Sequence, residues 1–209
     1  MNQRNYQKEL DRILTEIQAE AKAPRLFLHS CCAPCSSYVL EYLSQYFEIT
    51  VYYYNPNIFP AEEYDKRVEE ERRLIESMEF QHPVDLIAAP YHPEEFYEIA
   101  RGYEKEPEGG ERCLRCYELR LREAASMAAR LGYDYFTTTL TISPLKRADK
   151  LNEIGERLAA EYGVACLPSD FKKKNGYKRS TELSKEYGLY RQDYCGCVYS
   201  IRNTDEKML

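Results

Sequence analysis

The sequence predicts an α/β fold in which a mostly parallel sheet is flanked by helices. Short apolar stretches typical of strands alternate with longer stretches whose apolar residues recur at helical spacing. The chain of 209 residues, 44% of them hydrophobic, is long enough to bury one substantial core. No internal repeat, low-complexity stretch or linker interrupts this alternation. It therefore predicts one sheet covered by helices rather than several small domains.

The expected elements follow one another in order along the chain. An amphipathic helix is expected within residues 1–24, before the first strand. The strands are expected at 25–30, 49–54, 84–88, 135–138 and 164–167. The helices are expected at 36–47, 61–78, 93–101, 113–131 and 148–162. We assign residues 1–24 to an N-terminal helix and 25–209 to a single α/β domain of Rossmann-like or HUP-like arrangement, with the segment from Pro168 folding over the strand ends.

Composition and missing motifs exclude several classes of protein. The 31% charged residues have mixed signs, which argues against a disordered chain. The sequence contains no apolar run of about 18 residues, so it predicts no membrane-spanning helix. Its charged start lacks the apolar centre of a secretory signal. We therefore expect a cytoplasmic protein with no membrane partner. The sequence has no Walker-type phosphate loop, GxGxxG fingerprint or HExxH motif.

The cysteines are the strongest functional signal, because seven of the eight lie in three tight groups. The group Cys31-Cys32-Ala33-Pro34-Cys35 directly follows the first strand, at the carboxyl end where open α/β sheets bind ligands. Cys113 and Cys116 are three residues apart, so they point the same way from one helix. Cys195 and Cys197 flank one glycine, a spacing that permits metal chelation or a strained disulfide.

Three kinds of chemistry are compatible with these cysteines. An iron–sulfur cluster needs four thiolates and accepts them from distant segments. Structural zinc also needs four ligands, typically in paired CxxC groups. A thiol–disulfide enzyme needs only one close pair beside a strand–helix junction. More than four clustered cysteines favour redox chemistry over a closed zinc site. Cys166, alone in an apolar strand, is expected to pack as a small hydrophobic side chain, and His29 to pack or form hydrogen bonds.

A basic region in the last third of the chain is a second functional signal. From Thr141 to Arg191 there are 11 Lys and Arg against 7 Asp and Glu, a balance of +4 that leaves −10 for the rest. Within it, the basic loop expected at Ser169–Ser180 contains two aromatic rings, Phe171 and Tyr177, and suits contact with a nucleic-acid backbone, although a solvated basic loop has the same composition. The candidate cations are Lys172, Lys173, Lys174, Lys178 and Arg179. Candidate walls of a substrate pocket are Tyr190, Arg191 and Tyr194.

Five segments combine these signals in one specific pattern. They are Leu28–Cys35, Tyr54–Ile58, Cys113–Tyr117, Thr138–Pro144 and Arg191–Cys197. In this order they closely resemble the QueH family, the cobalamin-independent epoxyqueuosine reductases, over nearly the whole chain after about Arg25. The resemblance implies that the α/β domain is catalytic and reduces the epoxide of epoxyqueuosine in tRNA to queuosine, the last step of that modification. It implies tRNA carrying epoxyqueuosine and a separate electron donor as partners.

The resemblance also implies roles for the cysteines. Four of them would bind a 4Fe–4S cluster: Cys31, Cys32, Cys113 and Cys116. Cys195 and Cys197 would form a redox-active pair or bind an adjacent mononuclear iron. Some members carry Asp where Cys35 stands, which suggests that Cys35 binds or supports the second metal. Cys35, Cys195 and Cys197 are therefore the expected catalytic residues.

Two other interpretations remain open from the sequence. One is a tRNA-modifying sulfur or nucleotide-activating protein on a similar fold, which would need a glycine-rich loop where Cys31–Cys35 stands. The other is a zinc-stabilised RNA-binding module without catalysis, which would use the same thiols as structural ligands.

Overall fold

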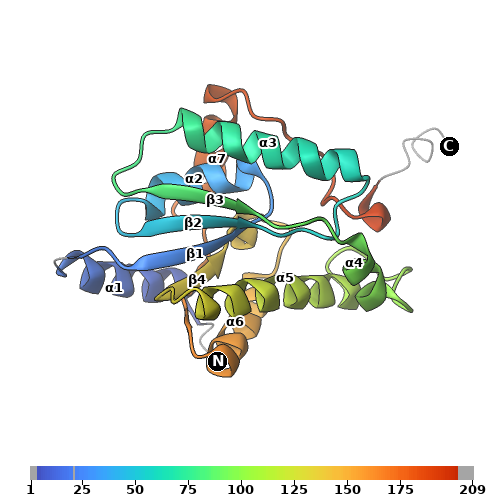
Figure 1. Cartoon of the computed structure of the whole chain (residues 1–209), viewed down its shortest axis with the longest axis horizontal. Coiled ribbons are helices and arrows are strands. Elements are labelled where there is room, and N and C mark those ends of the chain that lie inside the picture. The colour runs from blue at the N-terminus through green and yellow to red at the C-terminus, as the bar shows by residue number, and fades with distance from the viewer. Residues whose placement is uncertain (1–3, 21, 202–209) are drawn as a thin grey trace.

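A five-stranded, all-parallel sheet forms the centre of the protein (Figure 1). The computed structural model describes residues 4–20 and 22–201. The strand order is β3-β2-β1-β4-β5. The strands are β1 (Arg25–Ser30), β2 (Glu48–Tyr53), β3 (Val84–Ala88), β4 (Tyr135–Thr138) and β5 (Ala165–Cys166). The predicted α/β class with a parallel sheet is thus confirmed.

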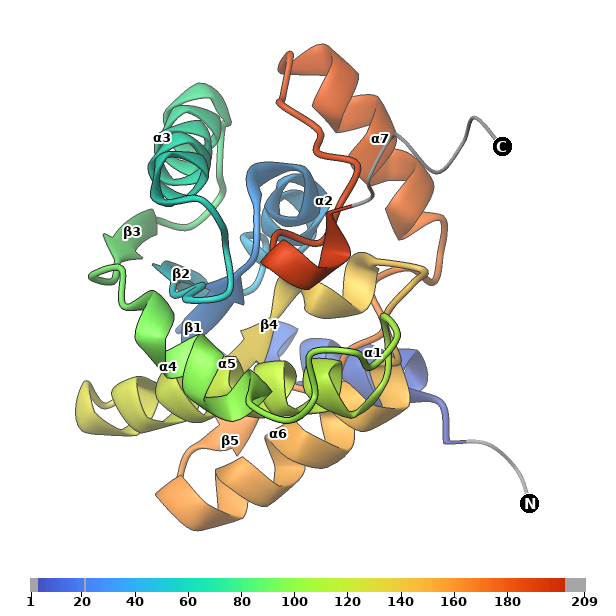
Figure 2. The same ribbon diagram turned by 90° about the vertical axis from the view of Figure 1, so that its right-hand side faces the viewer.

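Helices cover both faces of this sheet. In Figure 2, α2, α3 and α7 lie on one side, and α4, α5 and α6 lie on the other. The helices are α1 (Tyr6–Gln18), α2 (Ala33–Leu43), α3 (Ala61–Ser77), α4 (Pro93–Ala100), α5 (Glu111–Arg130), α6 (Ala148–Tyr162) and α7 (Gly176–Glu186). Two short 3₁₀ helices follow β4 and the last cysteines, η1 (Thr139–Ile142) and η2 (Val198–Ser200).

The central strand β1 shows why the sheet is apolar on both faces. Leu26 and Leu28 pack into the core on the α2 side, whereas Phe27, which points the other way, packs into the core under α5 and α6. A parallel strand covered on both faces reads as a continuous apolar run, because neither set of its alternating side chains reaches water. This is the pattern that marked Arg25–Ser30 as a strand.

The N-terminal helix shares the core on the α2 side. Its stripe of Leu10, Leu14 and Ile17 is buried together with side chains of β1 and α2. Residues 1–3, 21 and 202–209, which belong to the predicted helix and to the end of the predicted domain, lie outside the described residues. Within 4–20 and 22–201, no helix is both long enough and apolar enough to cross a bilayer.

Two elements differ from the sequence expectation. β5 is only two residues long, and helix α7, which packs on α2, replaces the second half of the expected basic loop. The sequence does not predict α7, because the buried side of this helix consists of small and polar residues around a single leucine, Leu183. The helix starts at Gly176, where a Cβ atom would lie 2.0 Å from the carbonyl oxygen of Phe171.

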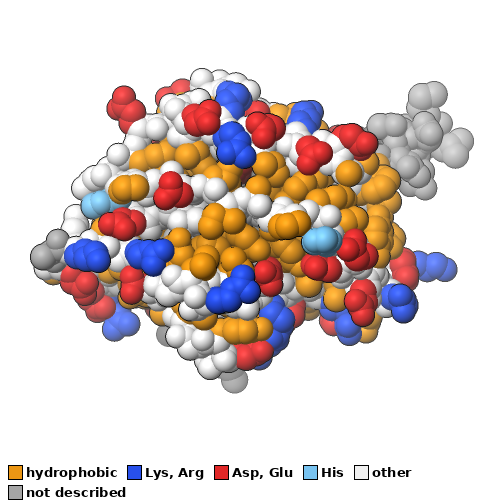
Figure 3. All heavy atoms as spheres, in the orientation of Figure 1, with side chains coloured by type: hydrophobic (Ala, Val, Ile, Leu, Met, Phe, Trp, Pro, Cys, Tyr) orange, Lys and Arg blue, Asp and Glu red, His pale blue; other side chains and the backbone are white. Residues whose placement is uncertain are grey.

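The edge strand β3 borders an apolar area of the surface. Figure 3 shows hydrophobic side chains between the charged ones of α3 and α5, over this edge. Ile87 is 37% exposed there. This area lies along the side of the sheet.

Candidate metal and redox centre

The carboxyl ends of β1 and β4 form the crevice of the site. The connections from these neighbouring strands lead in opposite directions across the sheet, and such a switch point is where open α/β sheets bind ligands. The Cys31 amide donates a hydrogen bond to Thr139 Oγ1 (3.2 Å). Asn55, which follows β2, donates to the Ser30 carbonyl (2.8 Å). Hydrogen bonds thus join Asn55 and Thr139, which follow β2 and β4, to the end of β1 at Ser30 and Cys31.

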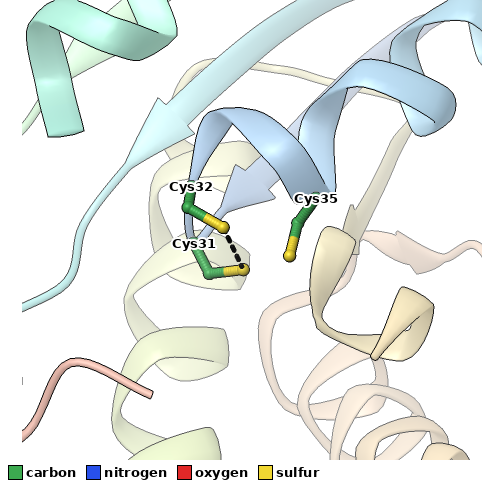
Figure 4. A group of neighbouring side chains, drawn as sticks. All are labelled: Cys31, Cys32 and Cys35. Atoms are coloured by element: carbon green, nitrogen blue, oxygen red, sulfur yellow. Dashed lines mark hydrogen bonds between the residues drawn. The ribbon is translucent and has the colours of Figure 1, made fainter. Parts of the chain in front are cut away.

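The first cysteine group occupies the turn from β1 to α2. Cys31 and Cys32 precede the helix, and Cys35 lies in its first turn behind Pro34. All three thiols point into the same space (Figure 4), with the Sγ atoms of Cys31 and Cys32 3.9 Å apart. The three sulfur atoms lie within 4.8 Å of one another. This spacing suits three thiolates around one metal centre.

Hydrogen bonds concentrate negative charge on one of these sulfurs. The Cys32 and Cys35 thiols donate to Cys31 and lower its pKa well below the usual thiol value. The same contacts, together with burial, raise the pKa of Cys32 to about 12 and that of Cys35 well above its usual value. The Thr139 hydroxyl adds a 3.5 Å hydrogen bond to the Cys31 sulfur. One thiolate shared by three sulfurs is a prepared ligand for a thiophilic metal.

The second cysteine group lies at the start of α5. Cys113 accepts a hydrogen bond from the Gly109 amide (3.2 Å), and Cys116 is buried one turn further along. Burial raises the pKa of Cys113 and raises that of Cys116 to about 12. Both thiols therefore keep their protons until a metal displaces them.

A buried arginine fixes the loop that leads to this second group. Arg112 donates from Nη1 to the carbonyl oxygens of Tyr103, Glu104 and Glu106, at distances of 3.0, 2.9 and 2.5 Å. These bonds hold the loop against the first turn of α5.

The third cysteine group is held by contacts with the loop after β2. The Phe59 amide donates to the Gly196 carbonyl (2.9 Å), and the Tyr194 hydroxyl donates to the Phe59 carbonyl (3.2 Å). Gly196 has φ +120°, and a Cβ atom there would lie 3.1 Å from Arg67 Nη1. The residue between Cys195 and Cys197 is therefore restricted to glycine, because a side chain would strain the backbone and crowd Arg67.

Two adjoining cavities bring the three groups together. The larger, of about 310 Å³, is lined by Cys31, Cys32, Cys35 and Cys195. The smaller is lined by Cys113, Cys116, Cys195 and Cys197. Cys195, Arg120 and Glu108 line both cavities. All seven clustered cysteines are free thiols and face this common space.

The remaining cysteine and the buried histidine lie in packed surroundings. Cys166 packs against Gly155 of α6, where a Cβ atom would lie 2.5 Å from its sulfur, and burial raises its pKa to about 12. His29 is fully buried between the Thr138 hydroxyl (2.8 Å) and the Tyr54 carbonyl (3.2 Å). Burial, helped by the charge of Arg120, lowers the His29 pKa to about 3, so the ring is neutral. Both arrangements fit the structural roles expected for these residues.

The predicted substrate-contacting residues are divided between different places. Arg191 and Tyr194 line the larger cavity. Tyr190 instead packs against α3, where the Lys66 ammonium lies 3.3 Å from its ring centre. Lys172 and Lys173 line a neighbouring cavity of about 570 Å³. The structure thus brings only part of the predicted set to the thiols.

The basic stretch carries less free charge than its composition suggests. Lys174 pairs with Asp11 (2.6 Å), and Arg179 pairs with Glu41 (2.5 Å). Lys178 lies 3.9 Å from Glu182, and Lys172 lies 2.5 Å from Asp170. Phe171, one of the two rings considered for stacking, is buried in the core. Only Tyr177 of that pair is exposed, at 42%, and it lines the larger cavity.

Sequence reasoning missed several residues of the cavities. Arg120, Gln192 and Ser180 line the larger one. The spacing of Arg120, four residues after Cys116, places both on one face of α5 and could have identified it. Gln192 lies in the segment Arg191–Cys197 but was not singled out there, and Ser180 lies on α7, which the sequence did not predict. Lys146 lines both the larger cavity and the neighbouring basic one.

The residues present fit a thiolate-bound metal group. The donors are soft sulfur atoms, which select iron–sulfur clusters, zinc and other thiophilic metals. Arg120 Nη2 and Gln192 Oε1, both of residues that line the larger cavity, have no hydrogen-bond partner in the described residues. Unsatisfied buried groups are costly and are typical of sites that hold another molecule. Fold and site together define a cysteine-rich metal or redox protein on a parallel α/β scaffold.

Comparison with known proteins specifies the family. The family model described as epoxyqueuosine reductase QueH matches residues 26–203. The chain is 43% identical to the epoxyqueuosine reductase QueH of Streptococcus pyogenes over 95% of its length and 78% of the relative's. It is 44% identical to that of Staphylococcus epidermidis, covering 94% and 84% of the two chains. The Thermotoga maritima relative is 34% identical, covering 87% and 93%. This chain belongs to the QueH family, whose members are named as reductases, a class of oxidoreductases.

Proposed function

We propose that this protein reduces the epoxide of epoxyqueuosine in tRNA, which gives queuosine in the last step of that modification. The single observation that carries the proposal is the convergence of seven free thiols on two adjoining cavities at the strand ends. The names of its relatives support the same activity. A reduced cytoplasm is the compartment in which these thiols stay available.

The proposed cofactor is a 4Fe–4S cluster held by Cys31, Cys32, Cys113 and Cys116. Cys35, Cys195 and Cys197 would serve a second centre, either a mononuclear iron or a dithiol. Cys195 and Cys35 both line the larger cavity, which supports a second centre that uses both. A bound cluster supplies single electrons, and an iron with an open position supplies Lewis acidity toward an oxygen atom.

The chain's own residues would then bind and orient the substrate. Removing the epoxide oxygen consumes two electrons and two protons, leaves a carbon–carbon double bond and releases water. Lys146 lines the larger cavity. Burial lowers the Lys146 pKa, but the charges of Cys195 and Cys31 outweigh burial and raise it above its usual value. Its Nζ therefore carries a proton that can form a hydrogen bond to the departing oxygen.

The tRNA is proposed to follow the two cavities that share Lys146. A loop base can be turned out of its stack and placed between aromatic and arginine side chains. Arg191, Tyr194 and Tyr177 line the larger cavity and offer such walls. The neighbouring cavity is lined by Lys173, which would meet the backbone phosphates, and by Lys172, whose pairing with Asp170 leaves it less free to do so. Lys174, Lys178, Arg179 and Tyr190, whose contacts are with the protein itself, would contribute less.

Replacing Lys173 with glutamate should weaken tRNA binding and make it less dependent on salt. Among the described residues, Lys173 has no ion-pair partner, so its charge is available to a phosphate. Loss of one such contact reduces the slope of log affinity against log salt by about 1. Filter binding over a series of salt concentrations measures this slope. Lys22→Glu, which makes the same change before the amino end of β1, is the matched control. Equal slopes for the two variants would remove Lys173 from the interface.

Anaerobic purification followed by metal and sulfide analysis tests the cofactor, and a nucleoside assay tests the activity. Iron with a comparable amount of acid-labile sulfide is expected. With a chemical reductant, the protein should convert epoxyqueuosine in tRNA to a nucleoside lacking one oxygen atom, detected by mass spectrometry after digestion. Zinc without sulfide, together with tRNA binding and no conversion, would instead support the zinc-stabilised RNA-binding module.

A further inference from the structure

Arg120 is a buried cation placed between the two thiol-lined cavities. Arg120 is only 2% exposed, yet it lines both cavities. From α5, its Nε donates to the Cys116 carbonyl (3.2 Å) and its Nη1 donates to Asn55 Oδ1 (3.3 Å). Its Nη2 has no hydrogen-bond partner in the described part of the chain.

The charge of Arg120 has no carboxylate to balance it. Arg67, which is equally buried, forms an ion pair with Glu63 at 2.8 Å. For Arg120, no carboxylate of residues 4–20 and 22–201 lies within ion-pair distance. Glu108, the one carboxylate that shares both cavities with it, is exposed. A buried charge without a counter-charge is strongly unfavourable. The site must therefore gain negative charge from elsewhere.

Apart from the exposed carboxylates of Glu108 and Asp193, the sulfur atoms are the source of negative charge that the described lining of the two cavities offers to Arg120. Cys116, Cys195 and Cys31 each raise the Arg120 pKa when ionised, although burial opposes them. When a metal binds, its cysteine ligands lose their protons, and the thiolates bring the missing charge. Lys146, which has no carboxylate partner in the described residues either, lines the larger cavity beside the same sulfurs.

We propose that Arg120 is the counter-charge of the thiolate-bound metal group and sets its reduction potential. This inference rests on the proposed function only in expecting a metal on these cysteines. A positive charge and a free N–H donor beside thiolate sulfurs favour the more negative, reduced state of a cluster. Arg120 is thus a positioning and tuning residue that acts through the metal group.

Three variants separate the charge of Arg120 from its packing. Arg120→Gln keeps a hydrogen-bonding side chain without the charge, and Arg120→Lys keeps the charge. Arg122→Gln makes the same change on α5, where the native arginine pairs with Glu118 (2.7 Å) and Glu161. Each protein is purified anaerobically with its native metal. Chelator-driven metal release and, for iron, the midpoint potential from a redox titration followed by EPR are then measured.

Arg120→Gln should release its metal at least about tenfold faster than the wild type, in the range for loss of an outer-shell partner. Its midpoint potential should fall by about 59 mV, a tenfold change in a one-electron couple. Arg120→Lys should restore most of both values, and Arg122→Gln should match the wild type. A wild-type potential and release rate in Arg120→Gln would overturn the inference.

The remaining outcomes also decide the question. If Arg120→Gln holds no metal, the thermal unfolding of the metal-free protein shows whether it is folded. A folded protein that takes up no metal supports the counter-charge. If Arg120→Gln does not fold, Arg120→Lys decides alone, because a lysine that fails to restore metal retention contradicts a role for charge. If the wild type holds zinc instead of iron, the cofactor proposed above is wrong, but the release rates still test Arg120.

Discussion

Serine in place of Cys116 should strip the metal from the protein, whereas serine in place of Cys166 should leave it bound. Cys116 is buried and Cys166 half-buried, and burial raises the pKa of each thiol to about 12. They differ in what surrounds them. Cys116 lines the small cavity with three other cysteines, whereas Cys166 packs on the glycine of α6. Position relative to the other thiols therefore distinguishes a ligand from a packed side chain.

Cys116→Ser is expected to lose essentially all of its bound metal. A serine oxygen is a harder and more basic donor than a thiolate, so it is a poor ligand for iron–sulfur clusters or zinc. We expect a loss of metal affinity of more than about 100-fold, beyond the cost of losing an outer-shell partner. Metal content, the visible absorption spectrum and nucleoside conversion measure the effect. If Cys116→Ser keeps the wild-type metal content, or Cys166→Ser loses it, the assignment of ligands is wrong.

The arrangement of the sheet could be predicted because each strand carries a local signal. Leu26, Phe27 and Leu28 make the middle of the first strand apolar on both faces, and the cysteines follow the strand at once. Parallel strands place their carboxyl ends at one edge of the sheet, and there a hydrogen bond joins the thiol turn after β1 to Thr139 after β4. Helix α7 escaped this reasoning, since it has only one buried aliphatic side chain to reveal its period.

The distribution of charge could not be predicted in the same way. Composition indicated a basic surface at residues 172–179, but two of its cations are paired with Asp11 of α1 and Glu41 of α2. These partners are more than a hundred residues away in the sequence, so only the fold brings them there. The opposite holds for Arg120. In the sequence only its spacing from Cys116 distinguishes it, and its importance comes from burial without a carboxylate partner among the described residues.

Spacing identified the three cysteine groups but not how they associate. The sequence resemblance pairs the first group with the second for one cluster. In the structure, Cys35 lies with Cys31 and Cys32, while Cys195 and Cys197 share the smaller cavity with Cys113 and Cys116. Cys195 belongs to both cavities. Substitution of single cysteines is therefore needed to determine which of the seven thiols bind each of the two centres.

Serine in place of Cys195 or Cys197 should abolish turnover while the cluster stays in place. If the other four cysteines hold the cluster, neither substitution removes one of its ligands, and absorbance and EPR spectra should remain those of the wild type. Reduction of an epoxide needs two electrons, and a cluster passes one at a time. Loss of the second centre should therefore lower kcat by more than about 1000-fold, the scale for removing a group that acts in the chemical step.

Val198→Ala is the matched control for these two variants. It shortens a half-buried side chain next to Cys197 without touching a thiol, so it reports on disturbance of the C-terminal segment alone. We expect it to keep both spectrum and turnover. Full turnover in Cys195→Ser and Cys197→Ser would remove the pair from the chemistry. Loss of the cluster spectrum in either variant would instead make that cysteine a cluster ligand, and the second centre would then have to be built around Cys35, whose sulfur lies within 4.8 Å of those of Cys31 and Cys32.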